Sequence, residues 1–331
     1  MSLVYILYNL IKAILLFVLI AFYFTRIYLR STTGICKSKR DLKGKLAIIT
    51  GGNTGLGKEV VRDLALRNAK IILACRTVKR GHKAAQEVIN STGNNNIHVR
   101  ECDLSSIKSV RNFANDILTS ETRLDILICF AGTGTPFGKH LTEDGIETQF
   151  ATNHLGHFLL VNLLIDLLKS SAPSRIVVTS SLAHRFGNID LENIVSSANY
   201  VNHPFTTYGD TKLANVMFMK ELSERLEGTG VCVNALHPGT IYTNGVKYNT
   251  IWYMKIFLLL LCFLYNRTVK EGAQTILYLA VSEQVEGITG QYFADCRKAN
   301  YNPQADDKSL CRKLWDISAK LCDIDSDRIS Q

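Results

Sequence analysis

Residues 50–57 read Thr50-Gly51-Gly52-Asn53-Thr54-Gly55-Leu56-Gly57 and follow an apolar run over residues 46–50. A stretch with helical periodicity begins directly afterwards, at Lys58. Glycines let the backbone turn sharply and approach a pyrophosphate closely, and a helix N-terminus favours the negative charge. The order of strand, glycine-rich turn and helix therefore predicts a dinucleotide-binding α/β fold.

Short β-branched runs alternate with segments of helical periodicity through the rest of the chain. This is the pattern of a parallel sheet with helices on both faces. The sequence predicts a doubly wound, Rossmann-type α/β domain with seven strands, and a helix over 309–321. The expected strands are residues 46–50, 71–75, 98–102, 126–130, 175–179, 231–236 and 291–294.

The basic charge of the chain is concentrated at its amino end. The formal net charge is +9, and +6 of it lies before Asp41, where no acidic residue occurs. A nucleic-acid-binding surface would need its basic residues on the folded domain, so we expect no nucleic acid as partner. The charge instead indicates a juxtamembrane segment that contacts membrane lipid.

Residues 3–25 are almost entirely apolar and would extend about 35 Å as a helix, enough to cross a bilayer. Because Lys12 interrupts the run, a shallow interfacial insertion stays open. No basic residue precedes the run and bulky residues follow it, which favours an uncleaved anchor over a signal peptide.

The basic residues after the anchor predict that the rest of the chain faces the cytosol, with the endoplasmic reticulum as the expected membrane. A lipid droplet or a mitochondrion is the alternative. With the domain in the cytosol, the sequons at Asn90 and Asn266 would stay unglycosylated.

We expect an anchor (1–30), a basic linker (31–44), one domain (45–300) and a helical tail (301–331). An apolar run at 256–265 predicts a membrane or substrate flap near 245–267, with a buried helix as the alternative.

The nine cysteines form no C-x-x-C pair and no cluster with zinc-ligand spacing. The sequence therefore predicts reduced thiols and no metal.

The end of the second expected strand reads Ala74-Cys75-Arg76-Thr77, with Lys79 and Arg80 following. A carboxylate here would bind the ribose 2′-hydroxyl of NAD, whereas a guanidinium suits the 2′-phosphate of NADP. The sequence predicts NADP(H) in preference to NAD(H). A solvated surface charge is the alternative interpretation of Arg76.

Tyr208 and Lys212 lie one helical turn apart, on the same face of an expected helix. The spacing alone is not diagnostic, because Tyr8 and Lys12 repeat it inside the anchor. The order along the chain is more specific. A glycine turn comes first, Ser180 and Ser181 end a strand, and the Tyr208/Lys212 pair opens the next helix.

With these motifs in this order, the chain resembles the short-chain dehydrogenase/reductase superfamily and is similar to its membrane-anchored retinol dehydrogenase group. The resemblance covers about residues 44–320. It rests on residues 50–57, Cys102-Asp103-Leu104, residues 153–158, residues 175–184, residues 208–215, His237-Pro238-Gly239 and Glu271-Gly272-Ala273.

The resemblance implies roles for four catalytic residues. Tyr208 resembles the general acid/base, Ser181 the hydroxyl that positions the substrate carbonyl, Lys212 the ribose-binding ammonium and Asn153 the fourth member. Ser180 is the rival of Ser181. Asp103 is expected to contact adenine, and Thr240, Ile241 and Thr243 to hold the nicotinamide amide. The implied cofactor-binding set is Thr50, Gly51, Asn53, Thr54, Gly55, Leu56, Gly57, Arg76, Asp103, Ala131, Gly132, Tyr208, Lys212, Pro238, Gly239, Thr240, Ile241 and Thr243.

One departure from the family pattern follows the fourth expected strand. The pattern is Asn-Asn-Ala-Gly, whereas this chain has Cys129-Phe130-Ala131-Gly132. Both amides that could bond across the sheet are missing, so we expect reduced stability or altered cofactor affinity.

The resemblance implies an NADP(H)-dependent oxidoreductase that interconverts a lipophilic alcohol and its aldehyde or ketone, mainly as a reductase. Retinol and retinal are the first candidates, and steroid, isoprenoid or lipid-derived carbonyls are alternatives. A membrane-tethered nucleotide-binding regulatory protein with little turnover is the alternative of another class. Oligomeric state stays open between monomer and homodimer.

Overall fold

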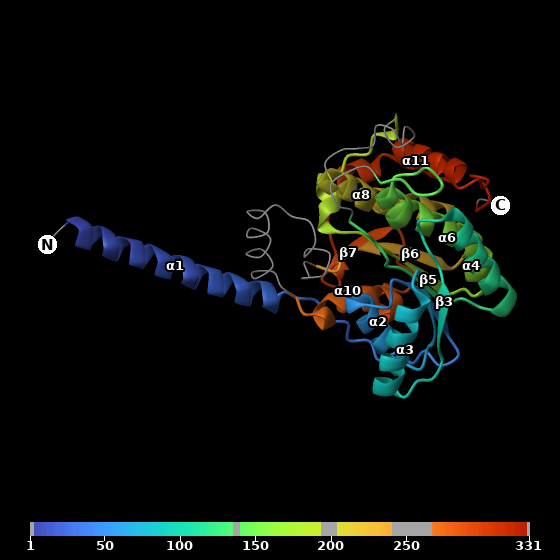
Figure 1. Ribbon diagram of the computed structural model, residues 1–331, viewed down its shortest axis with the longest axis horizontal. Coiled ribbons are helices and arrows are strands. Elements are labelled where there is room, and N and C mark those ends of the chain that lie inside the picture. Colours follow the sequence, from blue (N-terminus) through green and yellow to red (C-terminus); the bar gives the residue numbers. More distant parts are fainter. Residues whose placement is uncertain (1–2, 135–139, 193–203, 240–266, 330–331) are drawn as a thin grey trace.

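The computed structural model describes residues 3–134, 140–192, 204–239 and 267–329 (Figure 1). Its centre is one sheet in the strand order β3-β2-β1-β4-β5-β6-β7-β8. The first seven strands run parallel, and β8 pairs antiparallel with β7. The strands are β1 (Leu46–Thr50), β2 (Lys70–Cys75), β3 (Ile97–Glu101), β4 (Ile126–Cys129), β5 (Ser174–Thr179), β6 (Val231–Leu236), β7 (Gln291–Ala294) and β8 (Arg297–Lys298).

Helices cover both faces of this sheet, and its central strands are buried on both sides. Every residue of β1 and β4 is buried. Figure 1 shows α2, α3 and α10 on one face and α4, α6 and α8 on the other. These helices are α2 (Gly55–Leu66), α3 (Val78–Thr92), α4 (Ile107–Ser120), α6 (Gly156–Ser170), α8 (Pro204–Arg225) and α10 (Val269–Val281). The Rossmann-type fold predicted from the sequence is confirmed.

The number of strands was predicted incorrectly: the sheet has eight strands, not seven. The eighth, β8, has two exposed residues, Arg297 and Lys298, and carries no apolar signal. It pairs with β7 because Asp295 and Cys296 both adopt positive φ angles, 52° and 55°, and close a two-residue hairpin turn.

The carboxyl-terminal helix α11 (Lys308–Leu321) packs on the outside of α8 (Figure 1). The side chain of Asp307 caps it by accepting a hydrogen bond from the backbone N–H of Leu310. Trp315 carries the contact inward, with its ring 4.8 Å from that of Phe158 on α6, and the two rings are nearly perpendicular. This helix therefore belongs to the same hydrophobic core as α6 and α8.

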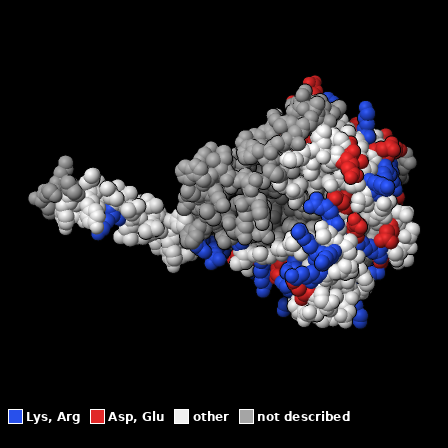
Figure 2. Space-filling view, in the orientation of Figure 1, with Lys and Arg blue, Asp and Glu red and all other residues white. Residues whose placement is uncertain are grey.

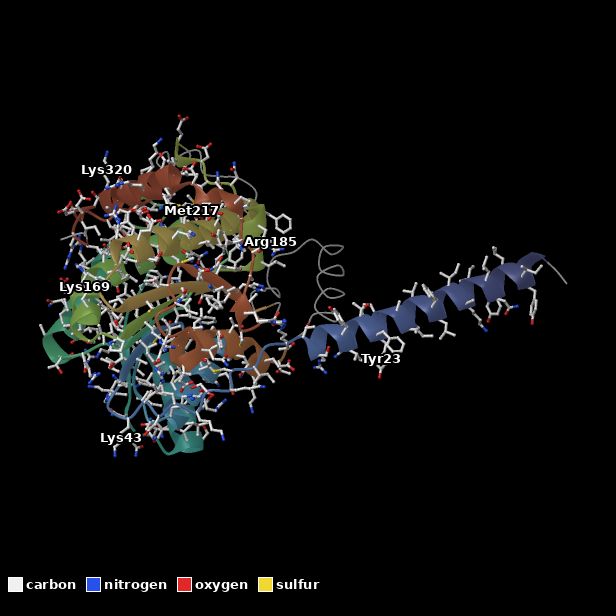
Figure 3. The ribbon with its side chains drawn as sticks, turned by 180° about the vertical axis from the view of Figure 1, so that it is seen from behind. Tyr23, Lys43, Lys169, Arg185, Met217 and Lys320 are labelled. Carbon is white, nitrogen blue, oxygen red and sulfur yellow. The ribbon has the colours of Figure 1, made fainter. Side chains whose placement is uncertain are left out.

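Helix α1 (Leu3–Ser31) projects away from the domain, with apolar side chains exposed all round it. Figure 3 shows this helix extending from the domain, with Tyr23 projecting from its side. By length and composition, residues 5–28 can cross a membrane, and none of the apolar window is buried. A second apolar helical stretch, residues 148–170, is 78% buried and is a core element.

Two features expected from the sequence lie outside the described residues. They are the flap near 245–267, apart from Arg267, and the cofactor contacts of Thr240, Ile241 and Thr243.

Candidate active site

The candidate site lies where the carboxyl ends of β1, β4, β5 and β6 meet, and its floor begins at the glycine-rich turn. Gly51 has φ of 72°, and a Cβ there would lie 2.9 Å from the Cα of Ala131. A Cβ at Gly57 would lie 2.3 Å from the carbonyl oxygen of Gly51. Any residue other than glycine would therefore clash with the backbone at both positions. The Thr54 side chain does not cap α2, so the first backbone N–H groups of this helix stay available to an anion.

Thr50 joins the ends of β1 and β4. Its Oγ1 accepts hydrogen bonds from the backbone N–H groups of Phe130 (2.9 Å) and Ala131 (3.0 Å). These contacts cross the sheet at the point where the family pattern has asparagines and this chain has Cys129 and Phe130. The backbone at Phe130 and Ala131, where this chain differs from the family pattern, is thus held by the Thr50 hydroxyl on the neighbouring strand.

A buried histidine, His157, orients this hydroxyl. Its Nδ1 lies 3.2 Å from the carbonyl oxygen of Asn153, which can only accept, so Nδ1 carries the hydrogen. Its Nε2 lies 2.9 Å from Thr50 Oγ1 and accepts the hydroxyl hydrogen. Burial lowers the pKa of His157 to about 3, so the ring is neutral at physiological pH.

Asn153 lies in a π-helical turn, η1 (Ala151–Leu155), just before α6. Its Oδ1 accepts a hydrogen bond from the backbone N–H of Thr133, and its Nδ2 donates to Thr211 Oγ1 (3.1 Å) on α8. Asn153 therefore ties the loop after β4 to the helix that carries the Tyr208/Lys212 pair.

Tyr208 and Lys212 project from α8 into this edge of the sheet. The Lys212 Nζ lies 5.6 Å from the centre of the Tyr208 ring and 3.4 Å from the carbonyl oxygen of Thr179. Burial lowers the pKa of Lys212 to about 8. Burial raises the pKa of the Tyr208 phenol, and a hydrogen bond with Ser181 opposes that rise. A phenol, a hydroxyl and a buried lysine side chain are therefore gathered at one place.

The two serines after β5 face different partners. Ser180 is buried, and its hydroxyl donates to the carbonyl oxygen of Lys212 at 2.7 Å. Ser181 is half-buried and is the serine that bonds Tyr208. Of the two, only Ser181 adjoins the phenol.

The remaining cofactor candidates follow the same edge. Arg76 is exposed just after β2, and Asp103 follows β3, where its carboxylate accepts hydrogen bonds from Ser105. Gly132 adjoins both Asn153 and Lys212, since a Cβ there would lie 3.3 Å from Lys212 Nζ. After β6, the Arg267 side chain lies against Gly239 and forms a 2.5 Å ion pair with Asp295.

Sequence reasoning missed His157, Thr211 and Arg267 as parts of this site. His157 follows Asn153 by four residues, a helical spacing that could have suggested the contact. Arg267 is far from Gly239 in the sequence, and no local pattern indicates their contact. Within the four described segments, no group of three or more His, Cys, Asp or Glu residues could hold a metal ion.

The described residues fit a nicotinamide dinucleotide. At this edge of the sheet, the glycines of the turn leave space that a Cβ atom would occupy, and the N-terminus of α2 has no side-chain cap. The buried ammonium group of Lys212 lies at the same edge. The Lys212 ammonium makes one long hydrogen bond within the described residues, to the Thr179 carbonyl oxygen at 3.4 Å, which leaves donors for an anionic or hydroxyl-rich ligand.

Comparisons with known proteins agree with this geometry. A sequence model of the short chain dehydrogenase family matches residues 45–253. Retinol dehydrogenase 11 of Mus musculus is 44% identical over 293 residues, covering 88% of this chain and 90% of the relative. Retinol dehydrogenase 14 of Homo sapiens is 45% identical over 292 residues, covering 84% and 86%.

Solved structures share the fold. An uncharacterized protein from Mycobacterium Paratuberculosis matches with a TM-score of 0.69 and 30% identity, covering 88% of this chain and 99% of that one. L-Sorbose reductase from Gluconobacter frateurii, complexed with NADPH and L-sorbose, matches with a TM-score of 0.61 and 22% identity, covering 77% and 96%. With this sheet, this site and these relatives, the chain belongs to the short-chain dehydrogenase family and is an NAD(P)-dependent oxidoreductase similar to the retinol dehydrogenases.

Proposed function

We propose that this protein is an NADP(H)-dependent, membrane-anchored oxidoreductase that interconverts a lipophilic alcohol and its carbonyl compound, mainly by reduction. Retinal and retinol are the first candidates, because relatives more than 40% identical over most of this chain are named retinol dehydrogenases. The observation that carries the proposed chemistry is the contact of Ser181 with Tyr208 one turn from Lys212.

Three residues supply the protein's part of the reaction. Tyr208 donates a proton to the substrate oxygen during reduction and takes it back during oxidation. Ser181 holds the same oxygen by a hydrogen bond as negative charge develops on it. Lys212 binds the cofactor ribose and favours the phenolate form of Tyr208. The nicotinamide ring, when bound, supplies or accepts the hydride at the substrate carbon.

Asn153 is the fourth residue of the proposed catalytic set, where it holds the loop that follows β4. The residues proposed to bind the cofactor are those of the glycine turn, Thr50 to Gly57, together with Arg76, Asp103, Ala131, Gly132, Tyr208, Lys212, Pro238, Gly239, Thr240, Ile241 and Thr243.

The preference for NADP(H) rests on Arg76. The side chain is exposed where β2 ends, and Lys79 and Arg80 follow on α3. Figure 2 shows Lys and Arg side chains gathered over α2 and α3. A guanidinium can bond two oxygens of a 2′-phosphate at once, which a ribose hydroxyl cannot match.

The cofactor preference is tested by Arg76→Glu. We expect the KM for NADPH to rise at least about tenfold, while NADH is used as well or better. Lys83→Glu makes the same charge change on an exposed position of α3 and should leave the preference intact. Unchanged NADPH preference in Arg76→Glu would refute the assignment.

Membrane anchoring with the domain in the cytosol is supported by the exposed apolar helix α1 and the basic residues that follow it. Asn90 tests this orientation, because its sequon is exposed near the end of α3. In microsomes that glycosylate proteins, the chain should show no mobility shift on glycosidase treatment. A shift that disappears in Asn90→Gln would place the domain on the opposite side.

The substrate is tested with membranes that contain the full chain, NADPH, and a panel of retinal, isoprenoid, steroid and aliphatic carbonyl compounds. The proposal predicts the highest kcat/KM for retinal. Tyr208-dependent turnover that favours a steroid or an aliphatic aldehyde would keep the enzyme chemistry and overturn the retinoid assignment.

A further inference from the structure

A cavity of about 630 Å³ lies where α1 meets the catalytic domain, and it borders the candidate active site at Asp295, the ion-pair partner of Arg267. One wall is the end of α1 and the segment that follows it, which we call the strap (residues 32–42). The other wall is the end of α10 and the β7–β8 hairpin. The lining residues are Ser31, Thr32, Thr33, Gly34, Ile35, Lys37, Ser38, Tyr278, Ser282, Glu283, Gln284, Asp295, Cys296 and Arg297.

The strap is fastened to the domain along its length. Gly34 packs directly on the hairpin, since a Cβ there would lie 1.9 Å from the Asp295 carbonyl oxygen. The Cys36 N–H donates to Gln274 Oε1 at 3.1 Å, and the Ser38 hydroxyl bonds Glu283 Oε1 at 3.1 Å. The cavity is therefore bounded by contacts that fix its two walls relative to each other.

The charged side chains that line this cavity are two basic ones, Lys37 and Arg297, and two acidic ones, Glu283 and Asp295. Its two acidic side chains are engaged by cations outside the lining, Glu283 by Arg40 (3.5 Å) and Asp295 by Arg267 (2.5 Å). Lys37 and Arg297 form no ion pair with any acidic side chain in the described part of the chain, and both are exposed. Figure 2 shows basic side chains at the place where α1 meets the domain.

Arg297 also connects the cavity to the anchor. Its Nη2 donates to the carbonyl oxygen of Thr32 at 2.7 Å, just beyond the last residue of α1. A guanidinium has five N–H donors, so this bond leaves others for a ligand. Arg297 thus occupies the junction between the anchor helix and the cavity.

The depth of the cavity relative to a membrane follows from the helix. The stretch that can cross a membrane ends at Tyr28, and Ser31 lies three residues later, or about 4.5 Å along a helix. Lipid headgroups occupy a layer of about 5–8 Å outside the hydrocarbon. If α1 is inserted as proposed above, the rim of the cavity lies at the level of the lipid phosphates.

We propose that this cavity binds the phosphate-containing headgroup of an anionic phospholipid, with Lys37 and Arg297 as the cationic ligands. The acyl chains of the lipid lie along the apolar surface of α1. The inference rests on the proposed membrane anchoring. It adds a lipid-binding site that holds the catalytic domain at a defined place on an anionic membrane surface.

The test uses the full chain, purified in mild detergent from membranes that contain phosphatidylinositol and phosphatidylserine, with retained lipid measured by native mass spectrometry. The wild-type chain should retain about one anionic phospholipid. Lys37→Gln/Arg297→Gln should retain it about tenfold less. The matched control is Lys39→Gln/Lys298→Gln, which removes the same charge from neighbouring exposed positions outside the lining.

The outcomes separate the site from its alternatives. Equal lipid loss in both double variants would indicate general charge attraction and overturn the site. Displacement of the lipid by millimolar inorganic phosphate would identify a free anion as the ligand and overturn the lipid assignment. Flotation on vesicles of phosphatidylcholine alone tests the anchor separately, and both double variants should float as the wild type does. A wild-type chain that does not float would contradict the anchoring and, with it, this site.

Discussion

The Asn153 side chain makes two hydrogen bonds to the backbone of Thr133: its Oδ1 accepts from the Thr133 N–H at 2.7 Å, and its Nδ2 donates to the Thr133 carbonyl oxygen at 2.9 Å. Thr133 directly follows Gly132, which adjoins Lys212. The two bonds therefore set the course of the loop that leaves β4 beside the proposed ribose site. The π-helical turn η1 places Asn153 where it can do this.

Asn153→Asp replaces a donating amide with an oxygen that faces the Thr133 carbonyl. We expect unfolding free energy to fall by about 2–4 kcal/mol and the Kd for NADPH to rise at least about tenfold. Asn162→Asp is the control, because Asn162 is buried on α6 and donates to the Phe158 carbonyl away from the site. It should lose stability without a change in Kd. Equal NADPH affinity in Asn153→Asp and the wild type would contradict the role.

Substitutions at Ser180 and Ser181 should have different effects, on stability at Ser180 and on catalysis at Ser181. Ser181→Ala removes the hydroxyl beside Tyr208, and kcat should fall by about 10²-fold or more with little change in NADPH affinity. Ser180→Ala removes the bond to the Lys212 carbonyl, and should cost about 1 kcal/mol of stability while activity is retained. Steady-state kinetics and denaturant unfolding measure the two effects. The reverse pattern would assign the catalytic hydroxyl to Ser180.

In the cofactor-free protein, replacing Lys212 with an apolar residue should raise the free energy of unfolding. Lys212 is 3% exposed, and its lowered pKa means that the charged form is disfavoured by burial. Lys212→Met fills the same space without the charge, so unfolding free energy at pH 7 should rise by about 1–3 kcal/mol while turnover is lost. In the wild type, stability should increase as pH rises from about 8 toward 10.5, because the unfolded chain then binds the extra proton. A destabilised Lys212→Met would show that the ammonium is well satisfied in the free protein.

The buried histidines should make the fold sensitive to acid. Burial lowers the pKa of His154 from 6.5 to about 4, so the unfolded chain binds a proton that the folded chain does not. The contribution of the buried histidines to the free energy of unfolding is complete above pH 6.5. It is lost as the pH falls, by at most about 1.4 kcal/mol per pH unit for each histidine. His154→Gln should reduce the slope of stability against pH between 6.5 and 4. His98→Gln, exposed on β3, is the control and should leave it unchanged.

The sequence predicted the fold well where burial is complete. Predominantly apolar runs such as β1 and β4 can be recognised because a parallel sheet buries both faces of each strand. The eighth strand could not be recognised, because Arg297 and Lys298 are exposed and their pairing depends on two consecutive positive φ angles. Turn geometry of that kind leaves no apolar signature.

The site could be predicted for residues that stand in motifs and not for those that support them. The position of Tyr208, one turn before Lys212, is readable from a helical period. The bond between Thr50 and Phe130 is not, because it depends on which strands become neighbours in the sheet. The contact of Arg267 with Gly239 likewise arises only when distant segments of the chain meet.

The central claim is that Tyr208 exchanges the proton in an NADPH-dependent reduction of a lipophilic carbonyl compound. It is tested most directly by following NADPH oxidation in membranes that contain the full chain, with all-trans-retinal as substrate. Tyr208→Phe is compared with the control Tyr278→Phe, a half-buried tyrosine on α10. We predict turnover that falls by about 10³-fold in Tyr208→Phe and persists in Tyr278→Phe. Cofactor binding with equal turnover in the wild type and Tyr208→Phe would contradict the account.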